Sequence, residues 1–360
     1  MKYRISLYSL LFLFTFSNTT MGFEPLLLDD SNVCEPSAAL PITCTNGAES
    51  CLLVGDNEKE KSLYRFSLPD TPSDSPAVSY SKLKFKPKTK IEDIEGLTSL
   101  GTDTALIMGS HSRDSRCGLQ PERRLIATVQ VTKDGINVQQ KSQSNDISCA
   151  LLFGEAANSQ SGIAALCTSI DAAETAANDI VSKYSSGEIS SKTQAKGMCS
   201  SAAPFNAEGI VALTIPEEVK VWVGLRSPLV GNHPLADDGR NLAAIMRMKD
   251  TESFVFDAVA FLDMNGRGVR ELAYANDQIW VIAGPAQDSD EEFLLYAFSP
   301  SDLVSEAIIA PRLIRTLPTS SEGLAFVGGS MYVVIDGEGR LLGKCKVPGK
   351  YLRLSIPVSS

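Results

Sequence analysis

The chain has 360 residues, of which 43% are hydrophobic and 21% are charged, and its formal net charge at pH 7 is −10. A chain this acidic is a poor partner for nucleic acid or for an anionic membrane face, because both repel negative charge. Eight cysteines but only two histidines, with no Cys-x-x-Cys, argue against a zinc site. An even number of cysteines in an exported chain is instead typical of disulfides.

The first residues predict export. Lys2 and Arg4 precede an uninterrupted apolar run at 5–16, and small and polar residues follow it. This is the order of a secretory signal peptide, which we place at 1–22. The run is too short for a membrane span, which needs ~20 apolar residues. We therefore expect an exported protein, periplasmic or extracellular, with a single domain over 23–360 and no membrane anchor after cleavage.

An internal repeat organises the rest of the chain. In four places a glutamate begins a short apolar segment, and in a fifth an arginine stands there. After a short turn each of these segments is followed by a second apolar segment, and more polar, alternating segments come next. The repeat recurs at roughly 50–60 residues with one double-length gap, which fits the four short strands of a propeller blade. The heads of the repeat are Glu35, Glu95, Glu208, Arg270 and Glu322.

We predict an all-β fold, a β-propeller of five blades, with six blades as the alternative. A pair of β-sandwiches is the other architecture, but it does not explain the recurring head. The double-length gap holds an alanine-rich stretch at 163–183 that favours helix. We expect a helical, disulfide-containing insertion at about 142–205, with a loop at 185–196. Lysines at every second position of 82–90 predict an outer edge strand that is protected by charge.

The cysteines allow one firm pairing. Cys44 and Cys51 flank an Asn-Gly turn, which would bring two short strands together and place the two sulfurs within bridging range. The other six can pair in many ways. Among these we expect Cys117 with Cys149 and Cys167 with Cys199.

Five short segments together resemble one known family. They are IEGL at 94–97, GSHSR at 109–113, NAEGI at 206–210, VGLRSP at 223–228 and IAGP at 282–285. In combination they look like the bacterial family known as domain of unknown function 3616 (DUF3616), over a region from about Glu35 to Asp336. The resemblance implies a propeller-like fold and no activity, because none is assigned to that family. The cysteine-rich insertion departs from the family's pattern.

The repeat also predicts where a site lies. The first strand of each propeller blade lines the central channel, so the heads Glu35, Glu95, Glu208 and Glu322 ring one mouth, with Arg270 in the fifth position. Four converging carboxylates cannot all stay ionised without compensation. A hard cation such as Ca²⁺, bound by these four glutamates, is one remedy. Pairing with Arg113, Arg226 and Arg270 is the other, and the near balance of charge favours it. The second segments end near the same mouth with Asp56, His111, Arg113, Arg226 and Asp336.

Two functions follow from this arrangement. The favoured one is an exported binding or scaffold protein, whose partner is an unknown protein or a small anionic ligand. The alternative is a Ca²⁺-dependent hydrolase of lactones or phosphoesters, with calcium as its only cofactor. There His111 acts as general base, and Arg113 and Arg226, with Arg270 beside them, hold an anionic group of the substrate. No Gly-x-Ser-x-Gly, His-Glu-x-x-His or phosphate-binding loop occurs, and His233 is expected to be a loop residue.

Overall fold

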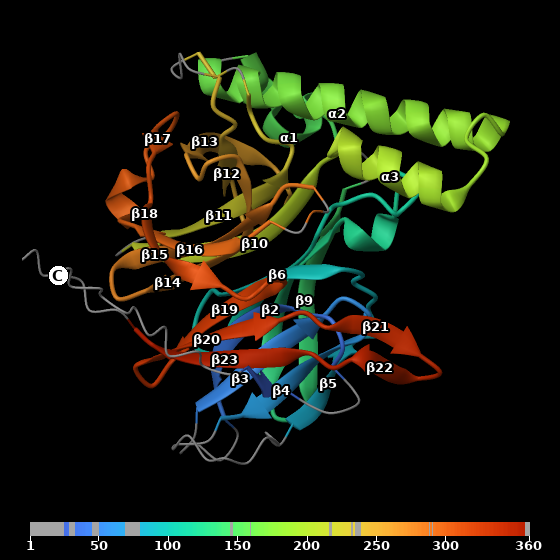
Figure 1. The fold of residues 1–360 in the computed structure, drawn as a ribbon. Coiled ribbons are helices and arrows are strands. Elements are labelled where there is room, and N and C mark those ends of the chain that lie inside the picture. The colour runs from blue at the N-terminus through green and yellow to red at the C-terminus, as the bar shows by residue number, and fades with distance from the viewer. Residues whose placement is uncertain are drawn as a thin grey trace, which may run out of the picture.

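The computed structural model describes residues 25–28, 33–44, 50–68, 80–144, 147–158, 160–215, 218–231, 233–234, 239–287, 289 and 291–356. The predicted signal peptide at 1–22 and the predicted Asn-Gly turn at 46–47 lie outside these residues. The described chain is an all-β protein whose strands form five blades, with a helical layer over one side (Figure 1). The predicted five-bladed propeller is confirmed.

Each blade is an antiparallel sheet that begins with its innermost strand. The first holds β2 (Pro36–Thr43), β3 (Ser50–Asp56), β4 (Ser62–Ser67) and β5 (Tyr80–Lys86), and the second holds β6 (Ile94–Ser99), β7 (Thr104–Gly109), β8 (Leu125–Thr132) and β9 (Gly135–Gln143). The third holds β10 (Asn206–Ile215), β11 (Glu218–Ser227), β12 (Ala243–Met248) and β13 (Phe256–Leu262), with β17 (Ile308–Ile309) beside β13. The fourth holds β14 (Arg267–Ala275), β15 (Gln278–Pro285), β16 (Phe293–Phe298) and β18 (Arg312–Leu317). The fifth holds β19 (Ser321–Val327), β20 (Ser330–Ile335), β23 (Lys350–Ser355) and β1 (Leu26–Leu27).

The innermost strands close into a ring in the order β2, β6, β10, β14, β19 and back to β2. Two features fasten the last blade to the start of the chain. The short strand β1 pairs with β23, at Leu26 with Tyr351, and a disulfide joins Cys34 to Cys345. Residues far apart in sequence therefore close the ring, which removes the free edge that an open sheet would carry.

Packing between blades explains why the inner strands are so apolar. Leu40 and Leu53 of the first blade pack against Ile94 and Ile107 of the second, and all four are buried. The outer strand β5 alternates as predicted, with Leu83 buried and the neighbouring lysines exposed. At its end β5 pairs in parallel with β9, so it is not a free edge over its whole length.

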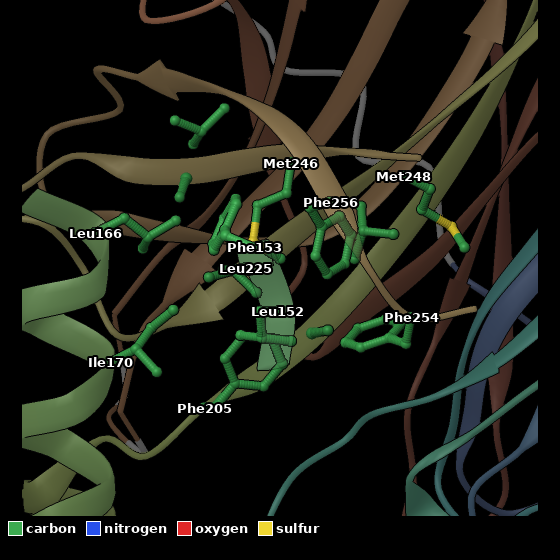
Figure 2. Close-up of a cluster of buried hydrophobic side chains, with 14 of the residues drawn as sticks. Leu152, Phe153, Leu166, Ile170, Phe205, Leu225, Met246, Met248, Phe254 and Phe256 are labelled. Atoms are coloured by element: carbon green, nitrogen blue, oxygen red, sulfur yellow. The ribbon is translucent and has the colours of Figure 1, made fainter. Parts of the chain in front are cut away.

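The insertion between the second and third blades contains α1 (Cys149–Phe153), the single-turn η2 (Gly154–Asn158), α2 (Ser161–Ser186) and α3 (Lys192–Ala202). Leu166 and Ile170 of α2 pack on the third blade, against a cluster that includes Phe205 (Figure 2). The loop expected at 185–196 is shorter than predicted. The Ser191 hydroxyl accepts a hydrogen bond from the Gln194 amide, which starts α3 four residues before the expected loop ends. None of the described helices is long and apolar enough to cross a membrane.

The eight cysteines form four disulfides, and the predicted Cys44–Cys51 bridge is confirmed. The predicted pairs Cys117–Cys149 and Cys167–Cys199 are wrong. Cys149 of α1 instead bonds Cys167 of α2, because these two helices fold back on each other, and Cys199 of α3 bonds Cys117 in the loop after β7. Four bridges fit a protein that resides in an oxidising compartment.

Candidate functional site

A cavity of about 470 Å³ opens at the end of the channel where the innermost strands begin. We call it the mouth cavity. Residues of every blade line it, and α3 forms part of its wall. The lining includes Asn57, Glu95, Lys196, Cys199, Asn206, Glu208, Arg226, Arg270, Glu322 and Asp336.

A β-bulge at the start of each inner strand places the charged heads. In β6, Ile94 pairs with Gly109 and Gly96 pairs with Met108, so Glu95 is the extra residue of the bulge. Arg270 and Glu322 occupy the same place in β14 and β19, and Glu208 lies in the irregular start of β10. Because a bulge changes the direction of the side chain at the extra residue, these heads turn into the mouth cavity.

The glycine after three of the heads has its own reason. A Cβ on Gly209 would lie 2.8 Å from the backbone of Glu271 on the adjacent inner strand, and the φ of Gly209 is +84°. Gly96 and Gly323 are similarly crowded, by Ile210 and by the backbone at Ala39. Glycine therefore allows the inner strands to approach one another around the axis.

In β14 a glutamate replaces that glycine. The Glu271 side chain is buried, and its carboxyl accepts hydrogen bonds from the amides of Leu272, Ala39 and Ile210, which belong to three different inner strands. A group that reaches three strands of the ring lies on the channel axis. Burial raises the pKa of Glu271 well above its ordinary value.

Glu35 is not part of the cluster, which corrects the predicted ring. In β2 the extra residue of the bulge is Ser37, because Pro36 pairs with Asp56 and Ala38 with Gly55. Ser37 donates a hydrogen bond to the Ile94 carbonyl. Glu35 precedes the strand, is half-buried, accepts from the Gly339 amide and does not line the mouth cavity. The repeat heads were aligned two residues out of register in the first blade.

The other three glutamates do converge. Glu95, Glu208 and Glu322 each contribute a carboxylate oxygen to a group whose atoms lie within 4.8 Å of one another. Arg270 binds two of them. Its Nε lies 3.0 Å from a carboxylate oxygen of Glu208 and 3.0 Å from one of Glu322, and its Nη2 donates to the second oxygen of Glu322.

Glu208 has two further partners. Arg226 Nη1 lies 3.2 Å from its Oε1, and the amide of Asn206 donates to the same oxygen at 2.7 Å. The predicted Glu–Arg pairing therefore exists for Glu208 and Glu322, through Arg226 and Arg270.

Glu95 differs from its neighbours, because its carboxyl has no hydrogen bond or ion pair within the described part of the chain. It is only 6% exposed. Burial, together with the carboxylates of Glu208 and Asp93, raises its pKa well above the ordinary value, and Arg270 opposes this. Burial, reinforced by the carboxylates of Glu322 and Glu35, also raises the pKa of Asp336, to about 8. The floor of the cavity thus holds protons more tightly than ordinary carboxyls do.

The remaining predicted residues lie elsewhere. His111 is buried in the core with its ring stacked on Phe254, at 3.6 Å between centroids, and burial lowers its pKa to about 3. It does not line the mouth cavity, so it is not placed to act there as a base. Arg113 lies in the cavity wall, but its guanidinium binds Glu174 of α2 at 2.6 Å and so anchors the insertion.

Two further residues serve the fold. Asp56 is buried and accepts from the amide of Cys34, so it fixes the chain before β2. His233 lies outside the strands, as predicted, and its ring contacts Phe261 at 4.3 Å between centroids.

Sequence reasoning missed a group of polar atoms around the mouth cavity. In the described part of the chain these buried atoms have no hydrogen-bond partner, although buried polar groups in folded proteins nearly always have one. The asparagines carried a weak signal, because Asn57 follows Asp56 and Asn206 stands two residues before Glu208. The atoms are Asn57 Oδ1, Arg123 Nε, Asn206 Oδ1, Arg270 Nη1 and Asp336 Oδ1.

Comparisons with known proteins agree with the propeller and leave the activity open. A family model described as "Protein of unknown function (DUF3616)" matches residues 48–311. No curated protein matches the chain.

Several solved structures are similar in fold. An exo-β-1,3-galactanase from Phanerochaete chrysosporium is 10% identical with a TM-score of 0.44, over 92% of this chain and 64% of that one. A mannose phosphorylase from Leishmania mexicana is 11% identical with a TM-score of 0.43, over 92% and 88%. A β-fructofuranosidase from Bombyx mori is 9% identical with a TM-score of 0.41, over 91% and 61%. This chain thus spans less than two thirds of the galactanase and of the fructofuranosidase.

Proposed function

Because the chain belongs to the DUF3616 family, whose function is unknown, we propose a function from the site itself: an exported binding protein that holds a small cationic ligand in the mouth cavity. The observation that carries this proposal is the set of buried polar atoms around the cavity that lack a partner. Such atoms are costly to bury unless water or a ligand satisfies them. A volume of about 470 Å³ is in the range of small-molecule sites.

The charge and the hydrogen-bonding character of the lining define the ligand. The carboxyls of Glu95, Glu208, Glu322 and Asp336 face only two guanidinium groups, those of Arg226 and Arg270. Most of the unpartnered atoms are acceptors, so the complementary ligand brings positive charge and N–H or O–H donors. This balance does not support the small anionic ligand expected from the sequence.

An organic ammonium group fits better than a bare metal ion. Ca²⁺ takes 6–8 oxygen ligands, but Arg270 already binds Glu208 and Glu322. A calcium ion would have to share these oxygens with a guanidinium. An ammonium group can donate to Glu95 and Asp336 and leave Arg270 in place.

Hydrolysis has less support than binding. The proposed base, His111, is buried away from the cavity, and Arg113 is committed to Glu174. The export part of the proposal is supported by the signal-like segment at 1–22 and by the four disulfides.

Thermal unfolding of the oxidised mature protein tests this function. It is measured with putrescine, with spermidine, with millimolar Ca²⁺ and with EDTA. A ligand at 100 times its dissociation constant adds about 2.7 kcal/mol, which raises the midpoint by several degrees. We expect the amines to raise the midpoint, and Ca²⁺ and EDTA to leave it unchanged. A rise with Ca²⁺ alone would replace the ammonium ligand by a metal ion.

Two variants locate the site. Glu95→Gln should abolish the amine effect with little loss of stability, because Glu95 has no partner to lose. The exposed Glu252 supplies the control, Glu252→Gln, which should behave as wild type. Coincident curves in every condition, or an amine effect that survives in Glu95→Gln, would refute the proposal.

A further inference from the structure

A small hairpin projects from the mouth side of the propeller. It consists of β21 (Glu338–Leu341) and β22 (Lys344–Val347), which pair only with each other and extend away from the body (Figure 1). Leu341 pairs with Lys344, so Leu342 and Gly343 form a two-residue turn at the tip. Leu342 is 97% exposed and Leu341 62%, which makes the tip the most exposed apolar point among the described residues.

Folding alone does not account for a leucine at this turn. Leu342 has φ +54° and Gly343 has φ +84°, so both adopt the left-handed conformation that this kind of hairpin turn requires. Asparagine followed by glycine is the usual choice, because leucine tolerates a positive φ poorly. Leu342 therefore costs stability through its backbone and also exposes its side chain to water.

The hairpin is held rigidly at its base. The Cys34–Cys345 disulfide ties β22 to the chain before β2. Arg340 of β21 pairs with Glu58 at 2.9 Å, and the Arg340 amide donates to the same carboxylate, also at 2.9 Å. The two leucines are thus presented in a fixed position, which lowers the entropy lost when they bind a partner.

Positive charge surrounds the tip, although the whole chain carries −10. Lys344 and Lys346 of β22 are exposed, and α3 exposes Lys192 and Lys196 and contains no acidic residue. Both elements border the mouth: Lys196 lines the cavity, and Asp336, which also lines it, lies two residues before β21. The mouth side therefore carries two basic arms, one with an apolar tip.

We propose that this side docks on an anionic lipid surface, with Leu341 and Leu342 in the interface and the lysines on the headgroups. A convex tip enters a lipid surface without a preformed cleft, whereas a protein partner would need one. The acidic body does not prevent this, because a strand of four residues spans ~13 Å and charges beyond about 10 Å are largely screened at 0.1 M salt. The mouth cavity would then face the membrane.

Cosedimentation with vesicles tests the docking, independently of any ligand in the cavity. The oxidised mature protein is mixed with vesicles of phosphatidylglycerol and phosphatidylcholine, and with vesicles of phosphatidylcholine alone. Two leucines and a few lysines give weak, reversible binding, of the order of a single acyl chain or below, so roughly millimolar lipid is needed. We expect binding to the anionic vesicles only, with loss at high salt.

The turn offers a variant whose two effects have opposite signs. Leu342→Asn should weaken vesicle binding about tenfold or more, while its thermal midpoint stays equal or rises, because asparagine suits the turn. Val304, 60% exposed on the fourth blade, supplies the control Val304→Asn, which should bind as wild type. No binding to anionic vesicles, or equal binding by Leu342→Asn, overturns the proposal. So does a change in self-association on Leu342→Asn without vesicle binding, since the tip would then be a protein contact.

Discussion

The Arg270 guanidinium is the group on which the mouth cluster most depends, and its removal is the sharpest test of the site's electrostatics. Arg270→Met keeps most of the side-chain volume and removes the charge. Arg270 is buried, and it binds Glu208 at 3.0 Å and Glu322 through both carboxylate oxygens. The variant therefore leaves two buried carboxylates without their main partner, next to a third at Glu95.

The expected cost at pH 8 is about 3–5 kcal/mol, the usual penalty for breaking a buried ion pair from one side. That is a large part of the total stability of ~5–15 kcal/mol of a typical domain. The cost should depend on pH. Without the guanidinium, the folded-state pKa values of Glu208 and Glu322 rise above those of the unfolded chain. A group whose pKa is raised on folding contributes stability that is present at low pH and is lost as the pH rises. The variant should therefore lie closer to wild type at pH 5 than at pH 8.

Urea unfolding of the oxidised proteins at both pH values measures these differences. Arg267→Met is a matched control on the same strand, where a partly exposed arginine donates only to the Glu292 carbonyl, and it should change stability by less than ~0.5 kcal/mol. Adding Glu322→Gln to Arg270→Met should recover part of the loss. An Arg270→Met protein within about 1 kcal/mol of wild type at pH 8, or a gap that is no smaller at pH 5, would refute the reasoning.

Three further predictions concern the cavity, the ring and the insertion. Asp336 has a folded pKa of about 8, raised above its ordinary value of 3.8, so wild-type stability should fall between pH 4 and 8, and Asp336→Asn should flatten that slope in urea titrations. Gly209→Ala should cost several times more stability than Gly239→Ala in urea unfolding, because both residues have a positive φ but only Gly209 faces a backbone within 2.8 Å; equal costs would mean that strand contact is unimportant. Removing the Cys117–Cys199 bridge by Cys117→Ser with Cys199→Ser should cost ~2–4 kcal/mol, and in hydrogen exchange it should release α3 before α2, since α2 packs on the third blade.

The number of blades was predictable because the repeat has a physical cause in every unit. Each inner strand needs a residue turned into the mouth and, in three blades, a glycine that admits the neighbouring strand. A pattern with two independent causes stands out in the sequence. The helix α2 was predictable for a similar reason, because its alanines favour helix over most of its length.

The first blade shows where such reasoning fails. Glu35 matched the head of the repeat by residue type, yet the bulge falls two residues later, at Ser37. Hydrogen-bond register decides which residue a bulge expels, and register depends on the facing strand, which the sequence pattern of one strand does not contain.

His111 and Arg113 failed for a related reason. Both follow a second strand, as the prediction required, but His111 has φ +56° and turns back into the core against Phe254. Arg113 is bound by Glu174, which lies 61 residues further along the chain. The disulfides Cys117–Cys199 and Cys149–Cys167 likewise depend on how α1, α2 and α3 fold back on the blades. Contacts of this kind come from tertiary packing, and no local pattern announces them.

The blade that breaks the repeat is the one that gives the mouth its chemistry. Where three other blades carry glutamate and then glycine, β14 carries Arg270 and then Glu271. The arginine takes the ring position and neutralises much of the charge of Glu208 and Glu322, while the glutamate takes the axial position and hydrogen-bonds three strands. A fourth glutamate in place of Arg270 would leave the ring without its central cation, and a glycine in place of Glu271 would leave the axis without that carboxyl. The exchange at these two positions is therefore a precondition for a stable acidic mouth, and Glu95, which Arg270 does not pair with, is left as the carboxyl that is available to a ligand.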